Sequence, residues 1–175
     1  MSEYQFTLMI EGDLVDEGTA RALFEVGCDD ATFGVVDGMG YGDFDRGASS
    51  FADGVLEAIS QVEMVNGLRV LRIEPDDIVT MSDIAERLDR TRESVRLLVA
   101  GRRGPGGFPS PISHAMQRVR LWRWSDVALW LGRLQPEEIE VARFTSAINA
   151  TLELRKQLKS MHDDLAIKQI RSLID

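Results

Sequence analysis

The sequence predicts an α+β protein built from three consecutive segments. This prediction follows from the order of strand-like and helix-like patterns, the placement of Gly and Pro residues, and an uneven distribution of charge. The chain has 175 residues, 44% of them hydrophobic, which is enough for one large or two small cores. The predicted segments are residues 1–77, 78–134 and 135–175.

Charge differs sharply between these segments. The net charge of −9 at first argues against a nucleic-acid partner, because polyanions repel an acidic protein. However, residues 1–79 hold 17 Asp and Glu against 4 Lys and Arg, whereas residues 80–134 hold 10 Arg, no Lys and 5 acidic residues. The planar fork of Arg suits phosphates and guanine edges. The middle segment is therefore a candidate DNA-binding region.

The first segment alternates patterns in the order β-α-β-β-α-β. The expected strands and helices, in chain order, are residues 4–10, 17–26, 31–36, 39–44, 51–64 and 68–73. Asp16 and either Ser49 or Ser50 are expected to cap the helices, and Asp37-Gly38 has the residue types of a type I′ hairpin turn. This order is that of the ferredoxin-like fold.

The acidic surface of the first segment has three possible functional interpretations. It can be a solvated face that keeps the protein soluble, a surface that repels DNA and so orients the basic segment, or a site for a basic protein partner. The run Gly38-Met39-Gly40-Tyr41-Gly42 lacks the spacing and context of a dinucleotide-binding loop, so no cofactor is expected. The single Cys28 excludes an intrachain disulfide and fits a reducing compartment.

The middle segment is predicted to be a winged helix-turn-helix. A short linker, residues 76–79, leads to a helix capped by Thr80, and Asp89-Arg90 forms the turn to a second helix at about 92–100. A Gly- and Pro-rich loop at 102–111 follows. The chain then returns as a strand at about 121–124, and Ser125 is expected to cap a third helix. A loop that leaves the second helix and returns as a strand forms a wing.

The second helix is the candidate recognition helix. Val95, Leu98 and Val99 are predicted to face inward, which leaves the charged face outward. Arg can read guanine and Glu can accept from cytosine, although an ordinary solvated face would look the same on the helix alone. The arginines of the wing would lie near the DNA backbone. The candidate DNA-binding residues are Thr91, Arg92, Glu93, Ser94, Arg96, Arg102, Arg103, Arg118, Arg120 and Arg123.

Four runs occur in a recognisable order: Ile84 to Leu88, Thr91 to Val95, Gly107 to Pro111, and Trp122 to Val127 with Trp130-Leu131. Together they resemble AlpA-type excisionase-like proteins, winged helices of the MerR superfamily, over about residues 78–134. Two features depart from that family: the longer insert at 102–107, and Arg96, where the family often has an aromatic residue. The resemblance implies DNA binding by a regulator of transcription, excision or mobile elements.

The third segment is predicted to be helical. Pro136 suits a first helical position, and no Pro or Gly follows it as far as Ile174. Leu154, Leu158, Met161 and Leu165 have the 4-3-4 spacing of a coiled coil or helical hairpin, and Asp163-Asp164 can begin a separate last helix. These helices can pack on their own domain or form a homodimer, and the length of the seam favours the homodimer.

The sequence contains no recognisable catalytic set. It has two histidines, His114 and His162, with no metal-ligand spacing, and neither a membrane span nor a secretory signal. We therefore expect a cytoplasmic, nucleoid-associated homodimer that binds double-stranded DNA, without enzymatic activity, cofactor, metal or membrane contact. The alternative is an antitoxin-like or adaptor protein whose acidic N-terminal domain binds a protein partner.

Overall fold

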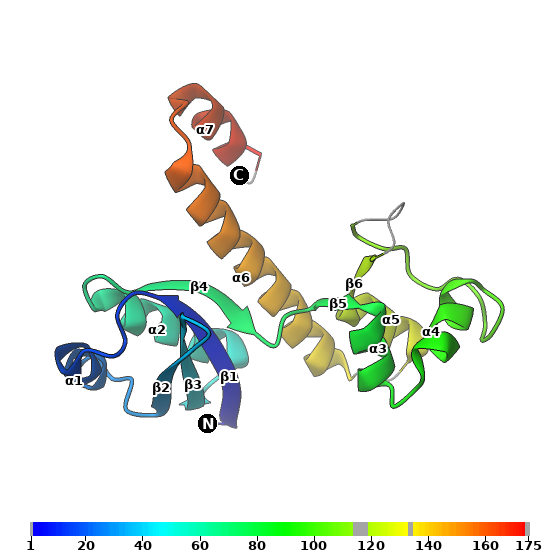
Figure 1. The fold of residues 1–175 in the computed structure, drawn as a ribbon, viewed down its shortest axis with the longest axis horizontal. Helices are drawn as coiled ribbons and strands as arrows, with labels where there is room; N and C mark the ends of the chain where they lie inside the picture. Colours follow the sequence, from blue (N-terminus) through cyan, green and yellow to red (C-terminus); the bar gives the residue numbers. More distant parts are fainter. Residues whose placement is uncertain (1, 114–118, 133–134, 174–175) are drawn as a thin grey trace. The chain divides into compact units, whose positions relative to one another are not determined.

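The computed structural model describes residues 2–113, 119–132 and 135–173. Within these residues the fold is mixed α+β, with a four-stranded and a two-stranded antiparallel sheet and seven helices (Figure 1). Contacts between residues divide the chain into two compact units. The first unit comprises residues 1–75 and 147–175, and the second comprises residues 76–146. The predicted C-terminal segment, 135–175, is thus shared between the two units.

The first unit contains every strand and helix predicted for the first segment. The elements are β1 (Ser2–Glu11), α1 (Glu17–Glu25), β2 (Ala31–Val36), β3 (Met39–Ala48), α2 (Phe51–Met64) and β4 (Arg69–Glu74). The sheet order is β2-β3-β1-β4. Asp16 and Ser50 cap the helices by accepting hydrogen bonds from the third residue beyond them. Asp37 and Gly38 have φ of 50° and 78°, as a type I′ turn requires.

The core of the first unit lies between the sheet and α2. Alternate residues of β1, including Leu8 and Ile10, are fully buried, and α2 buries Val55 and Val62 against the sheet. The other face of the sheet carries polar contacts, such as the hydrogen bond from Thr7 Oγ1 to Asp43, together with the buried Met9. The alternation along β3 matches its covered face, since every second residue is buried.

The C-terminal helices are α6 (Pro136–Ser160) and α7 (Asp164–Arg171), and Asp163 caps α7 as predicted. From residue 147 onward they belong to the first unit. Because α6 ends at Ser160, the predicted Leu154–Leu165 seam does not continue along one helix. Leu154 and Leu158 lie on α6, whereas Leu165 lies on α7 and is exposed.

The second unit contains β5 (Ile78–Thr80), α3 (Met81–Arg87), α4 (Arg92–Val99), β6 (Leu121–Arg123), α5 (Trp124–Leu131) and the first turns of α6. Thr80 and Asp83 form a capping box at the start of α3. β5 pairs with β6, and Ser113 forms an isolated bridge with Leu121. The helices and strands enclose one core, whose buried members are Val79, Ile84, Ala85, Leu88, Val95, Trp122 and Val127.

Two predictions in this region are wrong. Residues 76–79 are not a linker, because Ile78 and Val79 belong to β5 and Asp77 is buried. Ser125 does not cap α5, because the helix begins at Trp124 with Arg123 at its N-cap and no side-chain capping bond. Ser125 is instead buried and bonded to Asp77. A contact between residues far apart in the sequence therefore replaces the local cap.

Candidate nucleic-acid interface

Helix α4 presents the predicted charged face to solvent. The Thr91 hydroxyl accepts a hydrogen bond from the Ser94 backbone N–H at 3.2 Å, which fixes the start of the helix. Val95 and Leu98 are buried. Thr91, Arg92, Glu93 and Arg96 are exposed, and Ser94 is half-buried. The inward and outward faces of α4 are thus those that its periodicity predicted.

Glu93 and Arg96 form an ion pair on this face. Arg96 donates from Nε and from a terminal nitrogen to the two Glu93 carboxylate oxygens, both at 2.7 Å. These hydrogen bonds, with the charges of Arg96 and Arg102, lower the pKa of Glu93. Because both side chains are exposed, solvent screens the pair and it is easily opened. Arg96 can therefore leave Glu93 to donate to an acceptor on a ligand, or Arg96 and Glu93 can contact a ligand as a pair.

Two arginines from different elements line one small hollow. Arg92 of α4 and Arg120, which precedes β6, border a cavity of about 190 Å³ together with Thr80, Met81, Ser82 and Val119. The Arg120 guanidinium lies over the Trp122 ring, 5.6 Å from its centre. Neither arginine has an acidic partner among the described residues. The hollow therefore offers positive charge and hydroxyl groups to a bound anion.

Tryptophan side chains hold the Gly- and Pro-rich loop in place. Trp130 Nε1 donates to the Gly106 carbonyl at 2.9 Å, and Trp122 Nε1 donates to the Pro109 carbonyl at 3.1 Å. Phe108 packs edge-on against both rings. The tryptophans are thus packing residues, as predicted. Arg102 and Arg103 at the start of this loop are exposed and form no ion pair in the described part of the chain, although Arg102 lies near enough to Glu93 for its charge to lower the Glu93 pKa.

Arg123 is engaged within the second unit. Its guanidinium donates to the Ser146 hydroxyl and lies 3.7 Å from Asp77 Oδ2. Asp77 accepts hydrogen bonds from the Ser125 backbone N–H at 2.7 Å and hydroxyl at 2.9 Å. Burial nevertheless raises the pKa of Asp77, against the effect of these bonds and of Arg123. Arg123 does not border the hollow that Arg92 and Arg120 line.

Arg118, predicted as a wing contact, lies outside the described residues, as does His114. Among the residues that the structure does describe, no group of three His, Cys, Asp or Glu side chains could hold a metal ion. Within the same ranges, no helix is both long and apolar enough to cross a membrane.

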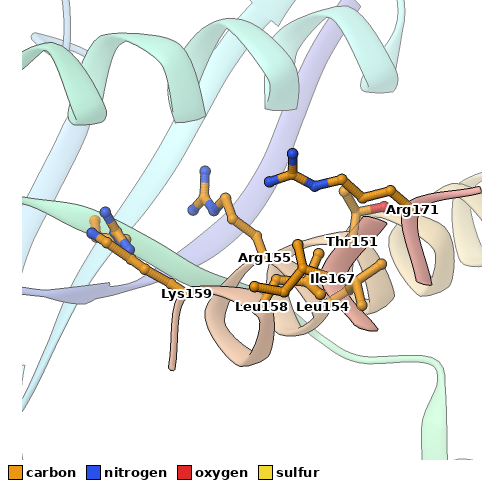
Figure 2. A pocket seen from close by; sticks show the side chains of 8 residues that line it. Thr151, Leu154, Arg155, Leu158, Lys159, Ile167 and Arg171 are labelled. Atoms are coloured by element: carbon orange, nitrogen blue, oxygen red, sulfur yellow. The ribbon is translucent and has the colours of Figure 1, made fainter. Parts of the chain in front are cut away.

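A second surface with binding chemistry lies in the first unit, and it includes Leu154 and Leu158 of the predicted seam. Helices α6 and α7 and strand β4 border a groove of about 640 Å³, whose side chains Figure 2 shows. Leu154, Leu158 and Ile167 form its apolar part. Its basic residues are Arg69, Arg155, Lys159 and Arg171. These are four of the nine Lys and Arg of a unit that also contains nineteen Asp and Glu.

The chain was compared with protein-family models, curated protein sequences and solved structures. No protein-family model, no curated protein sequence and no solved structure matches the chain. The candidate site therefore rests on its own geometry and chemistry.

Proposed function

We propose that this protein is a sequence-specific double-stranded DNA-binding protein that regulates transcription or a mobile element. The second unit would be a winged helix-turn-helix of the excisionase-like, MerR-superfamily type, and the first unit a ferredoxin-like domain. The order β5, α3, α4, β6, α5 supports the former, and the order β2-β3-β1-β4 of an antiparallel sheet supports the latter.

The observation that carries this proposal is the shared hollow of Arg92 and Arg120. A recognition helix and a wing must act on one duplex, so their basic groups must converge. Arg92 and Arg120 come from these two elements, line the same hollow and lack acidic partners among the described residues. In a complex, Arg120 would hold a backbone phosphate beside the base edge that Arg92 contacts.

In the proposed complex, residues 91–100 lie in the major groove. Arg92, Glu93, Ser94 and Arg96 contact base edges, while Thr91 and the basic loop and wing contact the backbone. The backbone set is Arg102, Arg103, Arg118 and Arg120. The bonds of Arg123 to Asp77 and Ser146 give it a structural role and leave it out of this set.

The experiment is selection of bound genomic fragments, followed by affinity measurements at several salt concentrations. Arg92→Ala should weaken binding to the selected site by about 1–3 kcal/mol and relax the preference at one base position. Arg120→Ala should weaken all duplexes and reduce the salt slope by about 1. A protein that shows no salt-sensitive binding to any fragment would contradict the proposal.

A matched control is available within the same unit. Arg143 on α6 forms an ion pair with Glu140 at a spacing of three residues, as Arg96 does with Glu93. Arg143→Ala should leave DNA affinity unchanged, whereas Arg96→Ala should reduce it. Equal losses would indicate a general charge effect and not a recognition face.

A second candidate is an antitoxin-like or adaptor protein that binds a protein partner through its first unit. The groove of Figure 2 favours this candidate, because an apolar floor with a basic border fits an acidic amphipathic helix. Fluorescence anisotropy with a labelled acidic, leucine-rich helical peptide tests it. Binding that Arg171→Glu abolishes would support the candidate, and absence of binding would remove it.

A further inference from the structure

The groove of Figure 2 has walls from three elements of the first unit. Strand β4 contributes Arg69, and helix α6 contributes Leu154 and Leu158. Helix α7 contributes Ile167 and Arg171. The volume of about 640 Å³ lies within the range of about 300–1,000 Å³ that is usual for small-molecule sites. The groove is therefore large enough for one small molecule.

The position of α6 beside β4 is fixed by side-chain hydrogen bonds. The Asn149 side chain bonds to both the N–H and the C=O of Ile73, at 2.8 and 3.0 Å. Arg155 donates to the two Glu63 carboxylate oxygens at 2.8 and 2.6 Å and to the Val70 carbonyl at 2.8 Å, and Glu63 also accepts from the Val70 N–H at 3.0 Å. These bonds form one wall of the groove without any ligand, and Glu63 offsets the charge of Arg155.

The floor of the groove is apolar. Leu154 and Leu158 are four residues apart on α6 and so lie on one face of it, and Ile167 adds to them from α7. All three side chains are half-buried, so a ligand would remove further apolar surface from water. A bound peptide helix is held by a longer row of anchors, at i, i+3, i+4 and i+7. This short patch therefore suits the apolar body of one small molecule.

The border of the groove is basic. Arg69, Lys159 and Arg171 form no ion pair with a described residue. Figure 2 shows the guanidinium groups of Arg155 and Arg171 pointing to the same side, away from the side chains of the apolar floor. The unit as a whole carries nineteen acidic and nine basic residues, so the border reverses its charge locally. An anion is therefore the complementary ligand.

The chemistry of the donors indicates which anion fits. Helix N-termini that bind phosphate do so through free backbone N–H groups. At the start of α7, however, Asp163 already accepts from the Leu165 and Ala166 N–H groups, both at 3.0 Å. The donors that remain are side-chain cations, among which the planar guanidinium of Arg171 matches a planar carboxylate.

We propose that this groove binds a small amphipathic carboxylate. The apolar body of the ligand covers Leu154, Leu158 and Ile167, and its carboxylate accepts hydrogen bonds from Arg171 at the basic border. The site lies outside the proposed DNA interface and does not depend on DNA binding. It takes a different occupant from the acidic helix of the second candidate function.

Isothermal titration calorimetry of the full chain with octanoate tests the site. Octanoate should bind at a single site. The uncharged 1-octanol should bind at least about tenfold more weakly, because it lacks the charge-assisted hydrogen bonds. Acetate, which has the charge without the apolar body, should not bind detectably. Equal affinities for octanoate and 1-octanol, or for octanoate and acetate, would overturn the proposal.

Matched variants locate the binding. Arg171→Gln should weaken octanoate binding about tenfold and leave 1-octanol unaffected, whereas Leu158→Asn should weaken both ligands. The control, Lys168→Gln, removes an exposed charge from the same helix outside the groove and should change neither. Arg171 is exposed, so its replacement should leave the far-UV circular dichroism spectrum unchanged. Equal losses in Arg171→Gln and Lys168→Gln would overturn the site. So would a wild-type protein that binds the acidic helical peptide but not octanoate.

Discussion

In the first unit, Arg46 and Arg155 form ion pairs with carboxylates of the same unit, whereas in the second unit Arg92, Arg102 and Arg103 form no ion pair with a described residue. Arginine thus has two roles in this chain. An arginine whose N–H groups all donate to protein acceptors stabilises the fold, and one whose N–H groups face water can bind a ligand. The number of arginines in a segment does not distinguish these roles, whereas the hydrogen-bond partners of each arginine do.

Arg46 is the most engaged of these arginines. It is 4% exposed and donates to both Asp30 oxygens at 2.7 and 2.8 Å, to the Gln61 side chain and to the Gly27 carbonyl. It thereby ties β3 to α2 and to the loop after α1. The short hydrogen bonds to Asp30 raise its pKa, so it stays charged although it is buried.

The largest expected effect follows from breaking this network. Arg46→Ala should lower the free energy of unfolding by about 3–5 kcal/mol, because Asp30 and Gln61 would lose their partner in a half-buried site. Urea unfolding followed by far-UV circular dichroism measures it. The control, Arg21→Ala, removes an exposed ion pair with Glu25 and should cost less than about 1 kcal/mol. Similar losses in both variants would contradict the comparison.

The next effect concerns Asp77, the buried carboxylate that Arg123 and Ser125 contact. Asp77→Ala should destabilise the second unit by about 1–3 kcal/mol, because it leaves the buried Ser125 N–H and hydroxyl without an acceptor. All three tryptophans, at 122, 124 and 130, lie in this unit, so their fluorescence reports its unfolding alone. Glu86→Ala, on the exposed face of α3, should change little. An unchanged midpoint in Asp77→Ala would show that Ser125 finds another acceptor.

A smaller effect appears at alkaline pH beside Arg46. Burial raises the pKa of the Cys28 thiol from 9.0 to about 11, even though Arg46 lies close enough to lower it. The folded state therefore holds the proton in a pH range where the unfolded chain loses it, so stability falls as pH rises from 9 to 11. The wild type should lose roughly 1–2 kcal/mol more than Cys28→Ala between pH 8.5 and 10.5. Parallel pH curves for the two proteins would exclude a buried neutral thiol.

The smallest effect tests whether Arg96, which is paired with Glu93, can contact DNA once that pair is removed. Glu93→Gln removes the carboxylate that holds Arg96 and should free it for a phosphate. Affinity for unrelated duplexes should rise, with a salt slope steeper by about 1, and any preference that Glu93 gives for cytosine should fall. Binding to matched and mismatched duplexes at several salt concentrations measures both changes. An unchanged salt slope would show that Arg96 stays off the DNA backbone.

Local patterns predicted the elements of this chain well. The strands and helices of the first segment, the Asp37-Gly38 turn, and the caps of α1, α3, α4 and α7 all depend on residues close in sequence, and they appear as predicted. The buried face of α4 follows from its periodicity alone.

Features that depend on contacts between residues far apart in the sequence were not predicted. Asp77 was predicted to lie in a linker, because nothing near it in the sequence indicates Ser125, its partner 48 residues away. Arg123 was grouped with the wing for the same reason. The groove at α6 and α7 joins residues of two helices with Arg69 of a distant strand, so local spacing indicated only its Leu154 and Leu158.

The division of the chain has a consequence for its synthesis. The first unit is assembled from both ends of the described chain, with the second unit inserted between residues 75 and 147. During translation, β4 leaves the ribosome long before Asn149 and Arg155, the residues that bond to its edge. Until about seventy further residues, including the whole second unit, have been made, the nascent β4 edge therefore lacks the bonds of Asn149 and Arg155 and has only that of Glu63. The order of synthesis thus favours completing the inserted unit before the unit that surrounds it in sequence.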